Sequence, residues 1–199
     1  HYCSSGADLV TAAGSSNDGV FANVVPADTS TTTDTQRKAK LRRFYNEPDV
    51  ALLNVNGTLA LTVNIGSGYR GHPLNKLTED RFYSFRTPVL TKPSTSEGTL
   101  TESSLYDATN NLLQAGTDSE KADASSAFSA TSGGWMIKMN GTGGEKVLTR
   151  ALTVNGYLYF NTYEPTANAN SCQASVGVNR SYVVNLADAT PVSTDSNST

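Results

Sequence analysis

The stretch that decides the fold is Asp49-Val50-Ala51-Leu52-Leu53-Asn54-Val55, followed by Asn56-Gly57 and then by Thr58-Leu59-Ala60-Leu61-Thr62-Val63-Asn64-Ile65. Asn-Gly between two apolar runs favours a two-residue turn, because both of its central residues need a positive φ. The pattern returns at residues 151–163, where Asn155-Gly156 separates two further apolar runs. Two antiparallel hairpins are therefore predicted, over residues 49–65 and 151–163.

Other short apolar or aromatic runs bounded by turn residues predict more strands. They cover residues 81–86, 135–139, 145–148 and 181–186. The runs at 135–139 and 145–148 are joined by a Gly-rich segment, which predicts a longer-looped hairpin. Residues 119–131 are the exception, because their Ala, Glu and Lys content fits either a short helix or a polar loop. We expect an all-β fold in which antiparallel strands dominate.

Composition excludes two classes of protein. The 199 residues carry 15 Lys and Arg against 18 Asp and Glu, a net charge of -3, so there is no cation excess to neutralise a nucleic-acid backbone. The longest apolar run, Val50–Val55, is far shorter than the roughly 20 residues of a membrane-spanning helix. The chain begins at His1 without the pattern of a signal peptide, and we expect it to be processed or truncated.

Three parts follow one another along the chain. Residues 1–40 are mostly Ser, Thr, Ala, Asn, Asp and Gly, and predict a loop-rich lead-in or peripheral segment. Residues 41–192 hold the predicted strands, and residues 193–199 form a polar tail expected to be flexible. The basic cluster at 36–43 fits a short helix whose charges face solvent, and alternatively an anion site.

The two cysteines, Cys3 and Cys172, stand near opposite ends of the chain. No Cys-x-x-Cys pair exists, which excludes a thiolate metal site. A disulfide between them would fit an oxidising compartment, whereas two unpaired thiols are the alternative that the sequence leaves open.

Residues suited to catalysis are scarce. The only histidines are His1 and His72, a poor supply for a Ser/His/Asp enzyme. The segment 66–73 has the glycines of a phosphate loop, but no Lys-Ser/Thr follows and no helix begins there, so we expect a sharp turn. Adjacent carboxylates such as Glu79 and Asp80 define no dyad, and no alternating Asp loop favours calcium. No catalytic residue, cofactor or metal ligand is predicted.

Aromatic residues offer a different signal. Tyr157, Tyr159, Asn161 and Tyr163 alternate along one predicted strand and therefore share a face. Such a row fits a half-buried sheet face, and alternatively a platform that binds sugar or peptide.

Several stretches of the sequence are specific when they are taken together. They begin with RFYNEPDVA at 43–51, IGSGYRGHPLN at 65–75 and DRFYSFR at 80–86, and continue through 134–136, 144–148, 160–165, Cys172 and 182–191. In order and spacing the first three stretches resemble the C-terminal β-propeller of PilY-type pilus tip proteins, and the later ones resemble its closing blades. The resemblance covers about residues 42–191.

The resemblance implies a partial β-propeller of antiparallel four-stranded blades, in a secreted protein at the tip of a type IV pilus. Its function would be non-enzymatic support of pilus biogenesis and of adhesion to host or abiotic surfaces, with minor pilins or other tip proteins as partners. The family's calcium loop has no matching positions here, so calcium would be bound elsewhere in a full-length protein. As loop contact residues we take Tyr69, Arg70, His72, Arg81 and Trp135.

Two alternatives remain beside this interpretation. A carbohydrate- or surface-binding secreted β-module would use the tyrosine-rich strands. A quinoprotein-like propeller enzyme would need carboxylate and amide metal ligands and often a vicinal disulfide, whereas the cysteines here are far apart. Since an incomplete propeller exposes strand edges, the isolated chain is expected to aggregate or to need its neighbouring chain.

Overall fold

The computed structural model describes residues 21–25, 33–55, 57–88, 99–139, 143–166 and 176–192. The strands are β1 (Ala22–Asn23), β2 (Asp49–Val55), β3 (Thr58–Gly66), β4 (Arg81–Pro88), β5 (Leu100–Thr101), β6 (Tyr106–Asp107), β7 (Gly134–Lys138), β8 (Lys146–Val147), β9 (Leu152–Val154), β10 (Tyr157–Glu164) and β11 (Val178–Asn185). The helices are α2 (Asp34–Lys40), α3 (Leu112–Ala115), α4 (Asp118–Ala130) and the 3-10 turn η2 (Glu102–Ser104).

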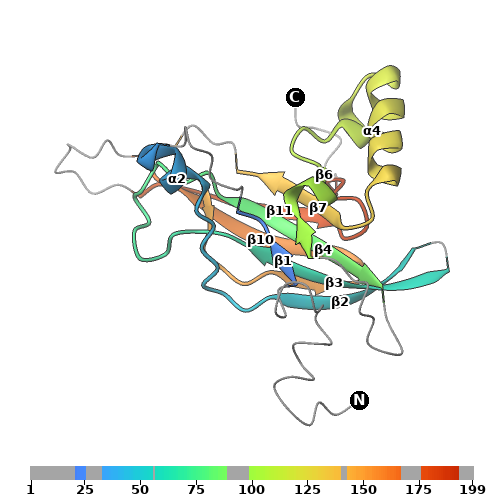
Figure 1. The fold of residues 1–199 in the computed structure, drawn as a ribbon, viewed down its shortest axis with the longest axis horizontal. Helices are drawn as coiled ribbons and strands as arrows, with labels where there is room; N and C mark the ends of the chain where they lie inside the picture. The colour runs from blue at the N-terminus through green and yellow to red at the C-terminus, as the bar shows by residue number, and fades with distance from the viewer. Residues whose placement is uncertain are drawn as a thin grey trace, which may run out of the picture.

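The described strands form three sheets. The largest has five strands in the order β2-β3-β4-β7-β6, and the second joins β11, β10 and β8, with β9 also paired to β10. A two-stranded sheet pairs β1 with β5. All pairings are antiparallel except β1 with β5 and β6 with β7. Figure 1 shows β10 and β11 running across the five-stranded sheet.

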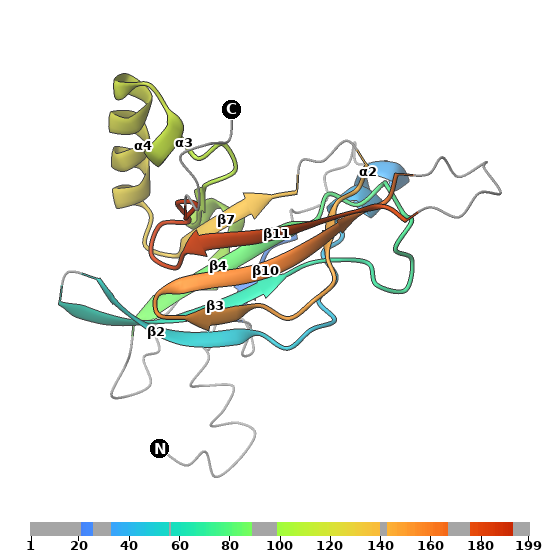
Figure 2. The same ribbon diagram turned by 180° about the vertical axis from the view of Figure 1, so that it is seen from behind.

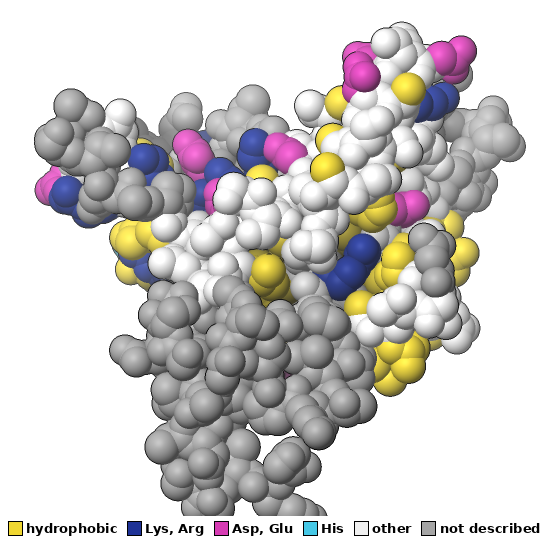
Figure 3. Space-filling view, turned by 45° about the vertical axis from the view of Figure 1, so that its right-hand side comes forward, with side chains coloured by type: hydrophobic (Ala, Val, Ile, Leu, Met, Phe, Trp, Pro, Cys, Tyr) yellow, Lys and Arg dark blue, Asp and Glu magenta, His cyan; other side chains and the backbone are white. Residues whose placement is uncertain are grey.

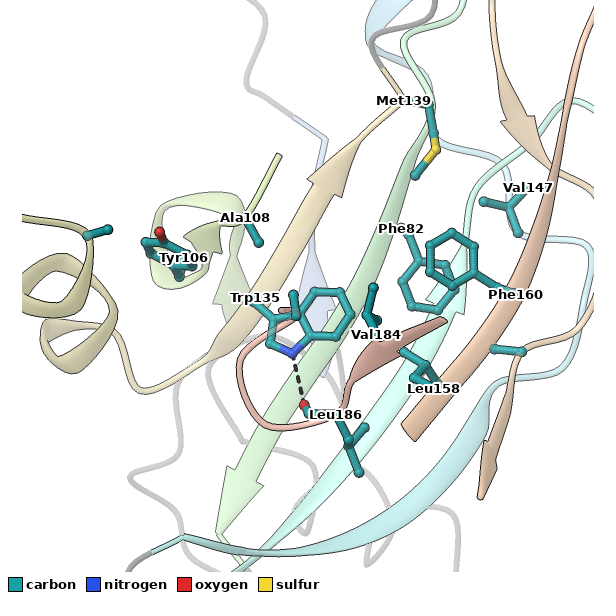
Figure 4. Packing of buried hydrophobic residues seen from close by; sticks show 13 residues of the cluster. Phe82, Tyr106, Ala108, Trp135, Met139, Val147, Leu158, Phe160, Val184 and Leu186 are labelled. Atoms are coloured by element: carbon teal, nitrogen blue, oxygen red, sulfur yellow. Dashed lines mark hydrogen bonds between the residues drawn. The ribbon is translucent and has the colours of Figure 1, made fainter. Parts of the chain in front are cut away.

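The two larger sheets pack face to face around aromatic side chains. Phe82 of β4 stacks on Phe160 of β10 with 3.9 Å between ring centroids. Trp135 of β7 is fully buried, and its indole Nε1 donates to the carbonyl of Leu186 at 2.9 Å, as Figure 4 shows. Val147 and Leu158 complete this first core, which therefore joins the two sheets.

A second core lies on the other face of the five-stranded sheet. It contains Tyr83, Phe85 and Met136, with Val24 and Leu105 packed on them. Tyr83 and Phe85 stack nearly parallel at 5.3 Å. Strand β4 is thus covered on both faces, which explains why Phe82 on one face and Tyr83 and Phe85 on the other are all apolar or aromatic.

Helix α4 forms because its first turn is capped. Thr117 Oγ1 accepts from the amide of Glu120, while the Glu120 carboxylate accepts from the Thr117 amide. Such a capping box satisfies two amides that have no partner within the helix. The helix extends away from the sheets in Figures 1 and 2, and the only residue it buries is Ala124.

Both Asn-Gly hairpins predicted from the sequence are confirmed. Val55 pairs with Thr58, and Val154 pairs with Tyr157. Asn155 and Gly156 both have positive φ, at 51° and 80°. The expected strands at 81–86 and 181–186 correspond to β4 and β11, and the ambiguous segment 119–131 is the helix α4.

The predicted hairpin between 135–139 and 145–148 is wrong. Strand β7 already has β4 and β6 as neighbours, so no edge is left for β8, which pairs with β10 in the other sheet. The chain crosses from one sheet to the other between Met139 and Lys146, and both flanks contribute to the first core through Met139 and Val147. The short strands β5 and β6 and the turn η2 were not predicted.

The all-β expectation agrees with this architecture, in which strands outnumber helices and antiparallel pairing dominates. The propeller stays a prediction, since two sheets packed face to face are common to sandwiches and to neighbouring blades. Cys3, Cys172, most of the lead-in and the tail lie outside the described residues. In the described segments, no helix combines the length and apolarity needed to cross a membrane.

The aromatic contact between the sheets gives a first prediction. Phe160→Ala should lower the free energy of unfolding by about 3 to 5 kcal/mol, because it opens a cavity beside Phe82. Tyr159→Ala, one residue earlier on the exposed face of β10, should cost only about 1 kcal/mol. Urea unfolding of both variants measures the difference, and equal losses would show that the sheets do not depend on this stack.

Candidate functional site

The segment between β3 and β4, residues 67–80, is the candidate site and is called the anchored loop below. It holds three of the five contact residues expected from the sequence: Tyr69, Arg70 and His72. At its start the Ser67 amide donates to the Arg81 carbonyl, and the Ser67 carbonyl accepts from the Val147 amide. The loop is therefore tied at its base to both large sheets.

Gly66, the last residue of β3, and Gly68 at the start of the loop allow close packing on Val147 of β8. A Cβ atom at Gly66 would lie 2.4 Å from the side chain of Val147, and one at Gly68 would lie 2.3 Å from the Val147 carbonyl. The chain can approach β8 this closely only because both residues lack a side chain. The Gly-rich motif thus has a packing role.

Lys146 holds the middle of the loop through hydrogen bonds to its backbone. The residue is fully buried, and its ammonium donates to the carbonyls of Pro73 at 3.0 Å, Asn75 at 2.8 Å and Gly144. Burial lowers the pKa of Lys146, which the charge of Asp80 opposes. Three carbonyls match the three donors of an ammonium group, so the desolvated charge is satisfied.

Asp80 closes the other end of the loop. Its Oδ1 accepts from the Ser67 hydroxyl at 2.8 Å, while its Oδ2 has no hydrogen-bond partner among the described residues. Burial raises the pKa of this carboxyl, opposed by the Ser67 hydrogen bond and by the charges of Lys146 and Arg42. The adjacent Glu79 lies in a different environment, because it is exposed whereas Asp80 is buried.

A second polar cluster lies beside this junction, centred on Glu102. Its carboxylate accepts from the Tyr83 hydroxyl at 2.6 Å and forms an ion pair with Arg81. The Arg42 guanidinium, also buried, donates through Nε to the Tyr83 oxygen at 3.3 Å. Burial and the neighbouring Glu102 raise the pKa of Tyr83.

The remaining two expected contact residues are placed elsewhere. Arg81 is largely buried in its ion pair with Glu102, and Trp135 is in the first core. Neither side chain is available at the surface, so we leave both out of the candidate contact surface. The burial of these two side chains could not be predicted from the sequence, because neither an arginine nor an aromatic residue in a strand signals whether its face of the sheet will be covered.

The aromatic residues of the anchored loop form a short stack. The Arg43 guanidinium lies 4.1 Å from the centroid of the Tyr69 ring, a cation–π contact, and the Tyr69 and His72 rings are 5.7 Å apart. Arg70, the next residue along the loop, is exposed to solvent.

A second exposed surface lies at the edge strand β2. Val50, Leu52 and Leu59 are 54%, 64% and 51% exposed. The two-residue turn makes Val55 and Thr58 a hydrogen-bonded pair, so the N–H and C=O groups of residues 50, 52 and 54 point away from β3. Figure 3 shows hydrophobic side chains gathered on this hairpin, at the lower right.

The tyrosine row of β10 agrees with the face predicted from the sequence. Tyr157, Tyr159 and Asn161 are exposed, whereas the alternate residues Leu158 and Phe160 are buried. A buried polar cluster at the far end of the strand was not predicted: Arg180 pairs with Glu164 at 2.6 Å, and Glu145 accepts from Tyr182 at 3.0 Å. Burial and Glu145 raise the pKa of Tyr182 to about 12.

The polar contacts of the anchored loop and of the two clusters are suited to a structural role, because they hold surface segments in fixed positions. The buried ionisable groups at the anchored loop, Asp80 and the neighbouring Lys146, are used in contacts that fix its conformation, whereas Arg70, Lys76 and Glu79 are exposed. Among the described residues, no group of three His, Cys, Asp or Glu side chains is positioned to bind a metal ion.

The chain is similar in structure to the crystal structure of the Pseudomonas aeruginosa PilY1 C-terminal domain. The TM-score is 0.48 at 14% sequence identity, and the match covers 87% of this chain and 38% of that one. No protein-family model and no curated protein matches the chain. At this level of similarity neither family nor function is assigned.

The Lys146 contacts give a second prediction. Lys146→Met should lower the free energy of unfolding by about 3 kcal/mol, because three buried carbonyls lose their donor. Amide hydrogen exchange within residues 67–80 should become faster than in the wild type. Lys121→Met on the exposed face of α4 is the control and should change neither quantity. Unchanged exchange in Lys146→Met would show that the loop is held by other contacts.

Asp80 gives a pH-dependent prediction. Because folding raises its pKa above the usual 3.8, Asp80 contributes stability that is fully present below pH 3.8 and lost as the pH rises through the native pKa. Asp80→Asn removes this ionisation. The unfolding free energy of the variant minus that of the wild type should therefore increase between pH 3.8 and neutral pH. Urea unfolding across this range checks the sign, and a constant or falling difference contradicts it.

Proposed function

We propose that the chain is a non-enzymatic binding module associated with a type IV pilus, which supports pilus assembly and surface attachment through protein contacts. The pilus assignment is motivated by the sequence stretches that resemble PilY-type proteins. The observation that carries the proposal is the meeting of three of these stretches in space. The Gly68 amide donates to the Arg43 carbonyl at 2.9 Å, and Ser67 bonds to Asp80 and Arg81.

The contacts at this junction favour a shared structural role for the resembling residues. Ser67, Gly68 and Asp80 are buried and bind one another or the backbone. Residues used in this way hold the loop in one conformation, and a loop that is ordered in advance loses less conformational entropy when it binds a partner. This supports the proposal of a module that acts by binding.

The edge of β2 is the surface we assign to a protein partner. Its outward N–H and C=O groups can pair with an extended segment, and the exposed Val50 and Leu52 can be covered by that segment's side chains. Neither Lys nor Pro protects this edge, although natural sheets commonly use them against unwanted pairing. The partner we propose is an extended strand of a minor pilin or another tip protein.

Pilus counting tests this function. Deletion of the chain should abolish surface pili, and Leu52→Lys should reduce their number several-fold, because a charge in an apolar contact disfavours pairing. Leu152→Lys, on the exposed face of β9, is the matched control and should leave pili normal.

The deletion and the Leu52→Lys variant test different parts of the proposal. Normal pili after deletion would contradict the function as a whole. Normal pili with Leu52→Lys alone would contradict only the assignment of the β2 edge.

A sugar-binding role is a second candidate, favoured by the exposure of Tyr157 and Tyr159 on one face of β10. Exposed aromatic rings on a flat strand can stack on sugar rings. A glycan array would show binding that Tyr157→Ala and Tyr159→Ala abolish, and an array without signal would exclude this role.

A further inference from the structure

The middle of the anchored loop presents its side chains outward from a fixed backbone. The carbonyls of Pro73 and Asn75 face the Lys146 ammonium, and Asn75 Oδ1 accepts from the Leu77 amide at 2.8 Å. Leu74 and Leu77 are nevertheless 56% and 54% exposed, and Lys76 between them is exposed. Two leucines and a lysine thus project from a loop whose backbone is held by the buried Lys146.

Cationic side chains lie on this loop and on the helix α2 beside it. The Glu79 amide donates to the Ala39 carbonyl at 2.9 Å, so the end of α2 lies against the end of the loop. This brings Lys38 and Lys40 to the same end of the molecule as Arg70 and Lys76. Figure 2 shows α2 and the neighbouring loop together on the right, and Lys and Arg side chains gather on the left of Figure 3.

The positive charge of this end is not compensated by neighbouring acids. Within the described part of the chain, none of these four cations takes part in an ion pair. The nearby acids Asp34 and Glu47 pair with other cations, Arg37 and Arg150. Glu79 is the remaining exposed acid of the loop. A net positive surface therefore exists on a chain whose total charge is -3.

We propose that this end, formed by α2 and the anchored loop, docks on the surface of an anionic lipid bilayer. Leu74 and Leu77 would enter the interfacial region, while Lys38, Lys40, Arg70 and Lys76 would lie at the level of the phosphates. Projecting apolar side chains flanked by cations match the two components of interfacial binding. A protein partner is the less favoured occupant, because the leucines project from a loop and do not line a recess.

The site is separate from the surface assigned to a protein partner. In Figures 1 and 2 the turn of the β2–β3 hairpin lies at the end opposite to α2. The bilayer contact therefore does not rest on the proposed pilus function, and each can fail alone.

Vesicle flotation tests the bilayer contact with the 199-residue chain. The chain is mixed with vesicles of phosphatidylcholine alone or with added phosphatidylglycerol, and the fraction that floats through a density gradient is measured. Aggregates do not float, so they cannot imitate binding. We expect flotation only with the anionic vesicles, and a decrease when the salt concentration is raised.

Two variants test whether the residues of the loop contact the bilayer, and two further variants are controls. Leu74→Ser with Leu77→Ser should reduce binding at least five-fold, and Lys76→Glu should reduce it by about five-fold or more, the change for each cation near an anionic surface. Leu152→Ser and Lys121→Glu change exposed residues elsewhere and should bind like the wild type.

Three results of the flotation experiment would overturn the proposal, and a fourth would come from a soluble polyanion. The three flotation results are no flotation with either vesicle, equal flotation with neutral vesicles, and losses in the control variants as large as those at Leu74, Leu77 and Lys76. Equal binding to soluble polyglutamate, lost in the same variants, would also overturn it in favour of an acidic peptide partner.

Discussion

A buried ammonium group is the constraint on which the arrangement of this molecule depends. Lys146 lies next to Val147, whose side chain is in the core between the sheets and packs on Gly66, and whose carbonyl approaches Gly68. A charge in this position must keep its hydrogen bonds, because removing an ammonium group from water without partners is very costly. The carbonyls of the anchored loop supply those bonds. The position of β8 and the conformation of residues 67–80 are therefore coupled.

The five-stranded sheet has two different faces, and this difference explains where surface remains open. One face packs on the second sheet through Phe82, and the other carries Tyr83 and Phe85 beneath the strands β1 and β5. The central strands are covered on both sides, but the cover does not reach the β2 edge, where Val50 and Leu52 stay exposed. Exposed apolar side chains on an open sheet edge are typical of surfaces that bind another chain.

Local signals predicted the hairpins well, because a turn and its flanking strands are neighbours in sequence. Asn155-Gly156 specifies positive φ values, and the register of β9 with β10 follows from the turn. The pairing of β8 could not be predicted in this way, since it depends on β7 having both of its edges occupied. Buried Lys146 was missed for a related reason: a lysine in a sequence signals exposure, and only the fold places three carbonyls around it.

The same limit applies to the candidate site. The residues that follow the motif at 66–73 argue against a phosphate loop, and Tyr69, Arg70 and His72 lie in one loop between β3 and β4. Gly66 and Gly68 of this motif, however, are explained by Val147, which is far away in sequence. Leu74 and Leu77 carried no local signal, because exposure of a leucine depends on what the rest of the chain leaves uncovered.

The order of the sheets along the chain has a consequence for how the molecule is made. The five-stranded sheet is complete by Lys138, whereas the second sheet begins at Lys146. A chain that is synthesised or exported from its N-terminal end can therefore pair all strands of the first sheet early. The inner face around Phe82 then stays open to water, and to other unfinished chains, until Phe160 emerges and covers it. A chaperone that shields this face during that interval would protect the step at which the nascent molecule is most prone to misassociate.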